Sequence, residues 1–228
     1  MLTADEIEIV LLSLKVAFAS VLVSAPLAVA CAYVLARWSF PGKTLFDAVV
    51  HLPLVLPPVV IGYFLLVLFG KQGMIGSALD SWFGVTFAFR WTGAALAAGV
   101  MGFPLMVRAI RLAIEAVPTK LEWAARTLGA SRWRVFFSVT LPLALPGLAV
   151  GVLLAFARSL GEFGATITFV SNIPGETQTL PLAIYSLTQS PGGDSAIVKL
   201  CAISVALSLA ALAVSEWVNR RTRAERGA

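Results

Sequence analysis

The chain has 228 residues, of which 59% are hydrophobic and 13% are charged. Soluble domains are roughly 45–50% apolar and ~25% charged, so this composition indicates a membrane protein. The mean hydropathy of +0.90 points the same way. A net charge of +5 would favour nucleic acid as a partner only on a soluble domain with a basic face. We therefore expect a lipid bilayer and no nucleic acid as a partner.

The first apolar run begins close to the N-terminus and is expected to stay in the mature chain. Asp5, Glu6 and Glu8 precede it, where a secretory signal would carry basic residues. Crossing a bilayer takes about 20 mostly apolar residues. Five segments meet or approach this length: residues 9–36, 46–69, 93–114, 141–160 and 197–218. The sequence thus predicts an all-α membrane domain of about five helices covering residues 1–228.

Basic residues alternate between the connections of these spans. Those after spans 1 and 3 and after the last span hold Arg37, Lys43, Arg108, Arg111, Lys120, Arg126, Arg132, Arg134, Arg220, Arg221, Arg223 and Arg226. The opposite connections hold only Lys71 and Arg90. Because cytoplasmic loops carry the excess of Lys and Arg, we expect the N-terminus outside and the C-terminus in the cytoplasm.

Two of the spans contain several prolines. Pro53, Pro57 and Pro58 in the second span remove backbone donors and are expected to kink or interrupt it. A broken helix must be buried in protein or face a water-filled path. Pro142 and Pro146 are expected near the start of the 141–160 helix, where proline costs little.

The loop at about 117–142 lies on the predicted cytoplasmic side. Its pattern predicts two short helices separated by Gly129 in a left-handed helix end. Thr119 and Glu122 match a capping box, and Ser131 can cap the second helix. One face of that helix is expected to hold Trp133, Phe136, Phe137 and Thr140. Such an apolar face requires a partner, which can be the lipid headgroup region or another protein.

Glu122, Ala124, Ala125 and Gly129, with Trp123 as a variable position, resemble the E-A-A-x3-G signature of ABC importer permeases. The resemblance implies that this loop docks on a cytoplasmic ATPase and transmits its closure to the membrane helices. Glu122 and the arginines would offer ion pairs, and the aromatic residues would anchor the loop to the third and fourth spans. The residues assigned to this coupling are Glu122, Ala124, Ala125, Gly129, Arg132, Trp133, Phe136 and Phe137.

Four segments, residues 39–63, 102–117, 121–143 and 155–181, are similar to molybdate ABC permeases. The NIPGETQTLP portion of the last favours molybdate over sulfate, which stays as the alternative, while tungstate is not distinguished from molybdate. The resemblance implies a homodimer in a bacterial inner membrane, with periplasmic N-termini, two ATPase subunits and a periplasmic molybdate-binding protein. That protein would dock on residues 163–194, where a short interfacial helix is expected around TLPLAIYSL.

The same resemblance assigns a translocation path or gate to the second span and the RSLGEFGA segment. The residues are Pro58, Val59, Val60, Ser159, Glu162 and Thr166. Arg158 and Glu162 are one helical turn apart, so an ion pair between them competes with a role in anion passage or gating. Lys15 and Lys199 can reach the interface, and His51 is interpreted as a satisfied interfacial ring.

No catalytic, metal or cofactor site is predicted. The chain has no G-x-x-x-x-G-K-[ST] motif, so ATP hydrolysis would belong to a partner. It also has no H-E-x-x-H or G-x-S-x-G motif of an intramembrane enzyme. A secondary transporter would need acidic residues near the membrane midplane, and Glu162 is near a span end. Cys31 and Cys201 lie in apolar runs and are expected to be unpaired core residues.

Overall fold

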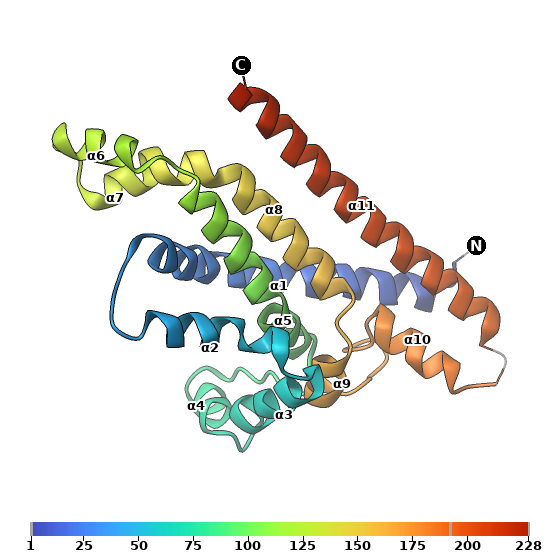
Figure 1. Cartoon of the computed structure of the whole chain (residues 1–228). Helices are drawn as coiled ribbons and strands as arrows, with labels where there is room; N and C mark the ends of the chain where they lie inside the picture. Colours follow the sequence, from blue (N-terminus) through green and yellow to red (C-terminus); the bar gives the residue numbers. More distant parts are fainter. Residues whose placement is uncertain (1, 192, 228) are drawn as a thin grey trace.

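The computed structural model describes residues 2–191 and 193–227, with side chains described as far as Trp217. Every regular element in this part of the chain is a helix (Figure 1). The elements are α1 (Ala4–Arg37), α2 (Lys43–Val55), α3 (Pro58–Phe69), α4 (Met74–Phe83), α5 (Trp91–Glu115), α6 (Thr119–Thr127), α7 (Arg132–Val135), the π-helix η1 (Phe136–Thr140), α8 (Leu141–Leu160), α9 (Gly164–Val170), α10 (Leu180–Thr188) and α11 (Asp194–Gly227).

Four helical stretches in the described chain are long and apolar enough to cross a membrane. They are Ala4–Arg37, Trp91–Glu115, Arg132–Leu160 and Asp194–Trp217. The fifth candidate consists of α2 and α3, which meet at an angle of 112°. The break falls at Leu56 and Pro57, both in extended backbone, with Pro58 at the first position of α3. Two successive prolines supply no N–H groups, and each disfavours helical backbone in the residue before it.

The neighbouring helices α1 and α5 run in the same direction. The Lys15 ammonium lies 3.8 Å from the centre of the Trp91 ring at one end. The Arg37 guanidinium donates to the Val117 carbonyl, 3.0 Å away, just beyond the other end of α5. Two parallel spans can be joined only by a segment that crosses back. The bent α2–α3 pair is therefore a broken span, which gives the five crossings that the sequence predicts.

Helix α8 packs antiparallel against α5 through small residues. A side chain at Gly102 would meet Ala155, and one at Gly151 would meet Ala109. Small residues let the backbones of membrane helices approach closely. Helix α11 packs on α8 and α10 at the outside of the bundle (Figure 1). The Lys199 ammonium near its start lies 2.9 Å from the Glu6 carboxylate of α1.

Helix α8 has the predicted bounds, Leu141–Leu160, with Pro142 in its first turn. The helices α7 and η1 run directly into it, so the candidate membrane span begins earlier, at Arg132. The five-residue π-turn η1 comes just before Pro142, and the Leu141 N–H bonds to the Phe136 carbonyl. Pro142 has no N–H to continue the α-helical ladder, and this wider turn carries the helix past it.

The remaining outcomes concern the first helix, two short helices, the cysteines and the C-terminal tail. Helix α1 starts at Ala4 with a capping box between Thr3 and Glu6 that was not predicted. Helix α4 was not predicted, whereas α10 forms where a short helix was expected. Cys31 and Cys201 are both free. The side chains of Arg220, Arg221, Arg223 and Arg226 lie outside the described residues, as does that of Val218 at the end of the last predicted span.

Candidate functional site

The turn between α6 and α7 has the geometry that the sequence predicts at two of its three positions. Gly129 has a φ of +86°, a left-handed conformation that favours glycine. The Ser131 hydroxyl caps α7 by accepting from the Arg134 N–H at 3.3 Å. The predicted capping box of Thr119 and Glu122 is wrong, because Thr119 is already helical and Pro118 is the cap residue.

Glu122 faces the helix bundle and is 4% exposed. Its Oε1 atom lies 3.0 Å from the Arg37 Nη2 atom and accepts from the Thr140 hydroxyl at 2.8 Å. Ion pairs of Glu122 with arginines were expected from the sequence, but its contacts with Arg37 and with the Thr140 hydroxyl were not. No short-range pattern could reveal Arg37, which is 85 positions away in the chain.

The aromatic residues of α7 and η1 do not share one anchoring role. Phe136 packs edge-on against Tyr33 of α1, with ring centres 4.9 Å apart. Trp133 and Phe137 stack on each other and are 74% and 59% exposed. Anchoring was expected on the third and fourth spans, but the ring of Phe136 packs on α1 and those of Trp133 and Phe137 are largely exposed, so this expectation is wrong.

Five large apolar side chains of the loop are exposed. We name them together the apolar loop surface: Leu121, Trp123, Leu128, Trp133 and Phe137, which are between 48% and 89% exposed. The guanidinium-bearing residues Arg126, Arg132 and Arg134 are exposed beside them. Ala124 is exposed and Ala125 half-buried on the same short helix. Apolar surfaces rimmed by charged residues typically mark interaction sites.

A second cluster of candidate residues lies at the other end of α8. Ser159, Glu162 and Thr166 are all buried. The Ser159 hydroxyl is 3.0 Å from that of Ser20 and donates to the Ala98 carbonyl at 3.4 Å. These bonds tie α8 to α1 and α5.

Glu162 makes two polar contacts within its own segment. Its Oε1 atom accepts from the Ala165 N–H at 2.9 Å, at the start of α9. Its Oε2 atom lies 2.7 Å from the Arg158 Nη1 atom. The ion pair between Arg158 and Glu162 that the spacing predicts is thus present.

The α2–α3 break meets this cluster through glycine contacts. A Cβ atom on Gly164 would lie 2.7 Å from the Pro58 Cβ atom, and one on Gly62 would lie 2.5 Å from the Ala165 carbonyl oxygen. Helices α3 and α9 therefore touch backbone to backbone. The structure brings Pro58 together with the 162–166 segment, while Val59 is 54% exposed and Val60 is half-buried.

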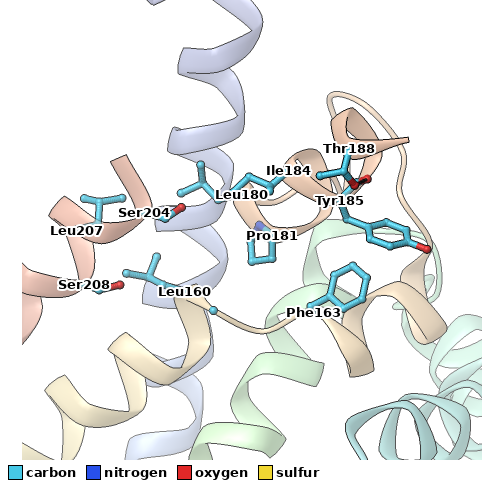
Figure 2. A pocket seen from close by; sticks show the side chains of 11 residues that line it. Leu160, Phe163, Leu180, Pro181, Ile184, Tyr185, Thr188, Ser204, Leu207 and Ser208 are labelled. Atoms are coloured by element: carbon cyan, nitrogen blue, oxygen red, sulfur yellow. Dashed lines mark hydrogen bonds between the residues drawn. The ribbon is translucent and has the colours of Figure 1, made fainter. Parts of the chain in front are cut away.

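A cavity of about 460 Å³ lies between the end of α8, α10 and α11. Figure 2 shows the side chains that line it. Its walls are mainly apolar, with hydroxyl groups at four positions, and consist of Leu160, Gly161, Phe163, Leu180, Pro181, Ile184, Tyr185, Thr188, Ser204, Leu207 and Ser208. No charged side chain lines it. Transfer of an unpaired charge into such surroundings is very costly, so this cavity is not suited to a small anion.

Several polar side chains outside these clusters also have partners in the bundle. His51 Nδ1 lies 3.1 Å from the Asp47 carboxylate, one helical turn earlier, as expected of a satisfied ring. Arg111 pairs with Asp47 and Glu115. Lys15 and Lys199 contact Trp91 and Glu6. Among the described residues, no group of three or more His, Cys, Asp and Glu side chains could hold a metal ion.

These features define a polytopic α-helical membrane protein with a broken second span and an apolar loop between its third and fourth spans. A family model described as a binding-protein-dependent transport system inner membrane component matches residues 24–224. The chain belongs to this family of transport permeases.

Two relatives match nearly the whole chain. It is 64% identical to the molybdenum transport system permease protein ModB of Escherichia coli K12, over 99% of each sequence. It is 58% identical to the protein of the same name from Haemophilus influenzae, over 97% of each. A solved bacterial alginate ABC transporter, in complex with an alginate-bound periplasmic protein, has a chain with a TM-score of 0.73 at 18% identity. The alignment covers 96% of this chain and 80% of that one, and it shows a shared fold.

Proposed function

We propose that this chain is the membrane-spanning permease subunit of an ATP-driven importer that carries molybdate into the cytoplasm. The observation that carries this proposal is the 64% identity, over 99% of both chains, with a molybdenum transport permease. Sulfate has less support as the substrate, because both relatives described above are named as molybdenum permeases. Tungstate, which has the same charge and shape, is expected to share the path.

ATP hydrolysis is assigned to two partner ATPase subunits. The apolar loop surface is the proposed docking site, because it presents two large aromatic side chains and exposed arginines on one short segment. Aromatic residues and Arg are the types that most often dominate protein interfaces. Small residues would let a groove of the partner approach the loop closely, and these are Ala124, Ala125 and Gly129. On the side that faces the bundle, Phe136 and Glu122 fix the loop to α1.

The translocation path is assigned to the contact between α3 and the 158–166 segment. Pro58, Val59 and Val60 begin α3 beyond the break, and Ser159, Glu162 and Thr166 lie on the segment that packs against it. The charge of Glu162 is balanced by Arg158, so it need not repel an oxyanion. Because five spans are few to enclose a path, we assign the second half of the path to a second copy of the chain.

The proposed orientation follows the distribution of basic residues. The end with Arg37 and the α6–α7 loop is cytoplasmic, and the end with Trp91 and α10 is periplasmic. A molybdate-binding protein would dock on the periplasmic segment 163–194. In the cycle, ATPase closure on two loops opens the dimer outward to receive the ion, and hydrolysis returns it to the inward-open state.

Uptake into proteoliposomes tests this proposal. The chain is reconstituted with its ATPase and binding protein, and molybdate and sulfate are offered separately with and without ATP. We expect ATP-dependent uptake of molybdate. Uptake of sulfate alone would overturn the assignment of molybdate as the substrate. Uptake that does not depend on ATP would overturn the ATP-driven mechanism.

Gly129→Pro adds a test of the loop. Proline fixes φ near −65°, whereas Gly129 has a φ of +86° and its N–H bonds to the Arg126 carbonyl. We expect ATP-dependent uptake to be lost. Gly84→Pro is the matched control, because Gly84 also ends a helix with a positive φ of 65° but lies at the end of α4. An equal loss in both variants would contradict a specific role for the loop.

A further inference from the structure

We propose that Arg37, at the end of α1, is a positioning residue that transmits movement of the α6–α7 loop to the membrane helices. It acts through a group of contacts that we name the Arg37 clasp: Arg37, Glu122, Thr140 and the Val117 carbonyl. This inference rests on the proposed function, since it concerns how ATPase closure at the loop reaches the spans.

The clasp joins three segments of the chain at one carboxylate and a fourth through Arg37. The Glu122 Oε1 atom, on α6, lies 3.1 Å from the Arg37 Nε atom and 3.0 Å from the Arg37 Nη2 atom. The same oxygen accepts from the Thr140 hydroxyl, at the junction of η1 and α8, at 2.8 Å. The Arg37 Nη2 atom also donates to the Val117 carbonyl between α5 and α6 at 3.0 Å. One movement of Glu122 is therefore felt by α1 and α8 together.

The clasp is buried, although it lies on a loop. The side chains of Arg37 and Glu122 are 13% and 5% exposed, and Thr140 is fully buried. An ion pair screened from water is much stronger than an exposed one, and loss of one partner leaves an uncompensated charge. The pair also suits both helices, because Arg37 lies in the last turn of α1 and Glu122 in the first turn of α6. These properties favour a fixed geometry over a flexible contact.

Helix α6 has exposed residues for the proposed docking and a buried residue, Glu122, in the clasp. Leu121 and Trp123, which flank Glu122 in sequence, are 48% and 62% exposed on the proposed docking side. Glu122 points the opposite way, into the clasp. A force applied to the exposed side of α6 thus reaches α1 through the Glu122 carboxylate, in addition to the covalent path through α7, η1 and α8. At Thr140 it enters η1, where the α-helical hydrogen-bond ladder is interrupted.

Arginine is required by this geometry. Its planar guanidinium presents several N–H donors at once, and here it serves the carboxylate and a backbone carbonyl together. Lysine would keep the charge but has no fork of donors. We therefore expect Arg37→Lys to be intermediate between the wild type and Arg37→Met.

The test measures molybdate uptake and ATP hydrolysis in the same proteoliposomes, and its readout is the number of ions transported per ATP. The variants are Arg37→Met, Glu122→Gln and the exchange of Arg37→Glu with Glu122→Arg. Glu122→Gln is the mildest, because its side-chain oxygen still accepts from Thr140. Lys199→Met is the matched control, since it removes a 2.9 Å ion pair that also involves α1 but lies near the opposite end of that helix.

We expect the single variants to assemble with the ATPase and to hydrolyse ATP, while ions transported per ATP fall by roughly 2- to 30-fold. The exchange variant restores an ion pair but loses the bonds to Val117 and Thr140, so it should recover only part of the ratio. Lys199→Met should keep the ratio. An unchanged ratio in the single variants would overturn the proposal, as would a loss of assembly, uptake and hydrolysis in equal proportion. If the wild type itself shows no ATP-driven molybdate uptake, the proposed function fails and the cause is not the clasp.

Discussion

The two candidate regions of this protein hold their helices together in opposite ways. At the α6–α7 loop, a long arginine side chain reaches a carboxylate across a gap between helices, and large apolar residues face outward. At the α3–α9 contact, backbone lies against backbone and the residues that permit it are glycines. The first contact joins the loop to the spans through a few buried side chains, whereas the second joins α3 and α9 along their backbones. We infer that the loop passes its movement to the spans through the Arg37 clasp and that α3 and α9 move as one unit.

The largest effect is expected at the α3–α9 contact. Gly164→Ala places a Cβ atom 2.7 Å from that of Pro58, and overpacking of this kind destabilises by about 1–3 kcal/mol. Uptake should be lost and the thermal unfolding temperature in detergent should fall. Gly161→Ala is the control, because a Cβ atom there is 4.0 Å from its nearest neighbour. Equal uptake and equal unfolding temperatures of the two variants would contradict a tightly packed contact between α3 and α9.

The next effect concerns the apolar loop surface. Trp133→Ala should weaken binding of the ATPase by about 2 kcal/mol or more, as truncation of a central aromatic residue does in an interface. The stability of the permease itself should hardly change, since Trp133 is 74% exposed. Binding is measured by titration of the detergent-solubilised permease with the ATPase.

Phe136→Ala is the partner experiment to Trp133→Ala. Phe136 packs on Tyr33, so its loss should lower the unfolding temperature more than it lowers the affinity for the ATPase. If Trp133→Ala destabilises the permease and leaves ATPase binding unchanged, the apolar loop surface is not the docking site.

A smaller effect separates the two roles considered for Glu162. Glu162→Met leaves Arg158 without its partner and should reduce stability and uptake. The double variant with Arg158→Met should recover much of both, because replacement of a whole ion pair by apolar residues is often close to neutral. Thermal unfolding and molybdate uptake are measured on both variants. An inactive but stable double variant would instead assign the carboxylate to anion passage.

The smallest effect is expected for Lys199→Met. The side chain of Lys199 is 38% exposed where it meets Glu6, and ion pairs of this kind contribute about 0–1 kcal/mol. The unfolding temperature and uptake should stay close to those of the wild type. A large loss of uptake would show that α11 is fixed to α1 by more than packing.

Local patterns in the sequence were enough to predict the spans and several turns. Pro57 and Pro58 mark the helix break because of covalent geometry, and Gly129 and Ser131 mark the turn between α6 and α7. The aromatic residues were assigned to one face too broadly. Phe136 and Phe137 are neighbours in the chain, so their side chains leave η1 in different directions, and only Phe136 packs on α1.

Long-range contacts could not be predicted from the single sequence. The partner of Glu122 is at the end of another span, and nothing near either residue identifies the pair. Glycines such as Gly62 and Gly164 give no periodic signal, and their role became visible only when the opposing backbone was in place. The earlier start of the fourth span depends on a π-turn that carries the helix past Pro142, which hydrophobic periodicity does not encode.

The most direct test of the account is the accessibility of the α6–α7 loop from each side of the membrane. Leu128, which is 89% exposed, is replaced by Cys in a chain whose Cys31 and Cys201 are replaced by Ala. A membrane-impermeant maleimide is then applied to spheroplasts and to inverted vesicles, with and without the ATPase. We expect labelling only in inverted vesicles and protection when the ATPase is bound. Labelling in spheroplasts, or labelling that the ATPase does not change, would contradict a cytoplasmic docking loop.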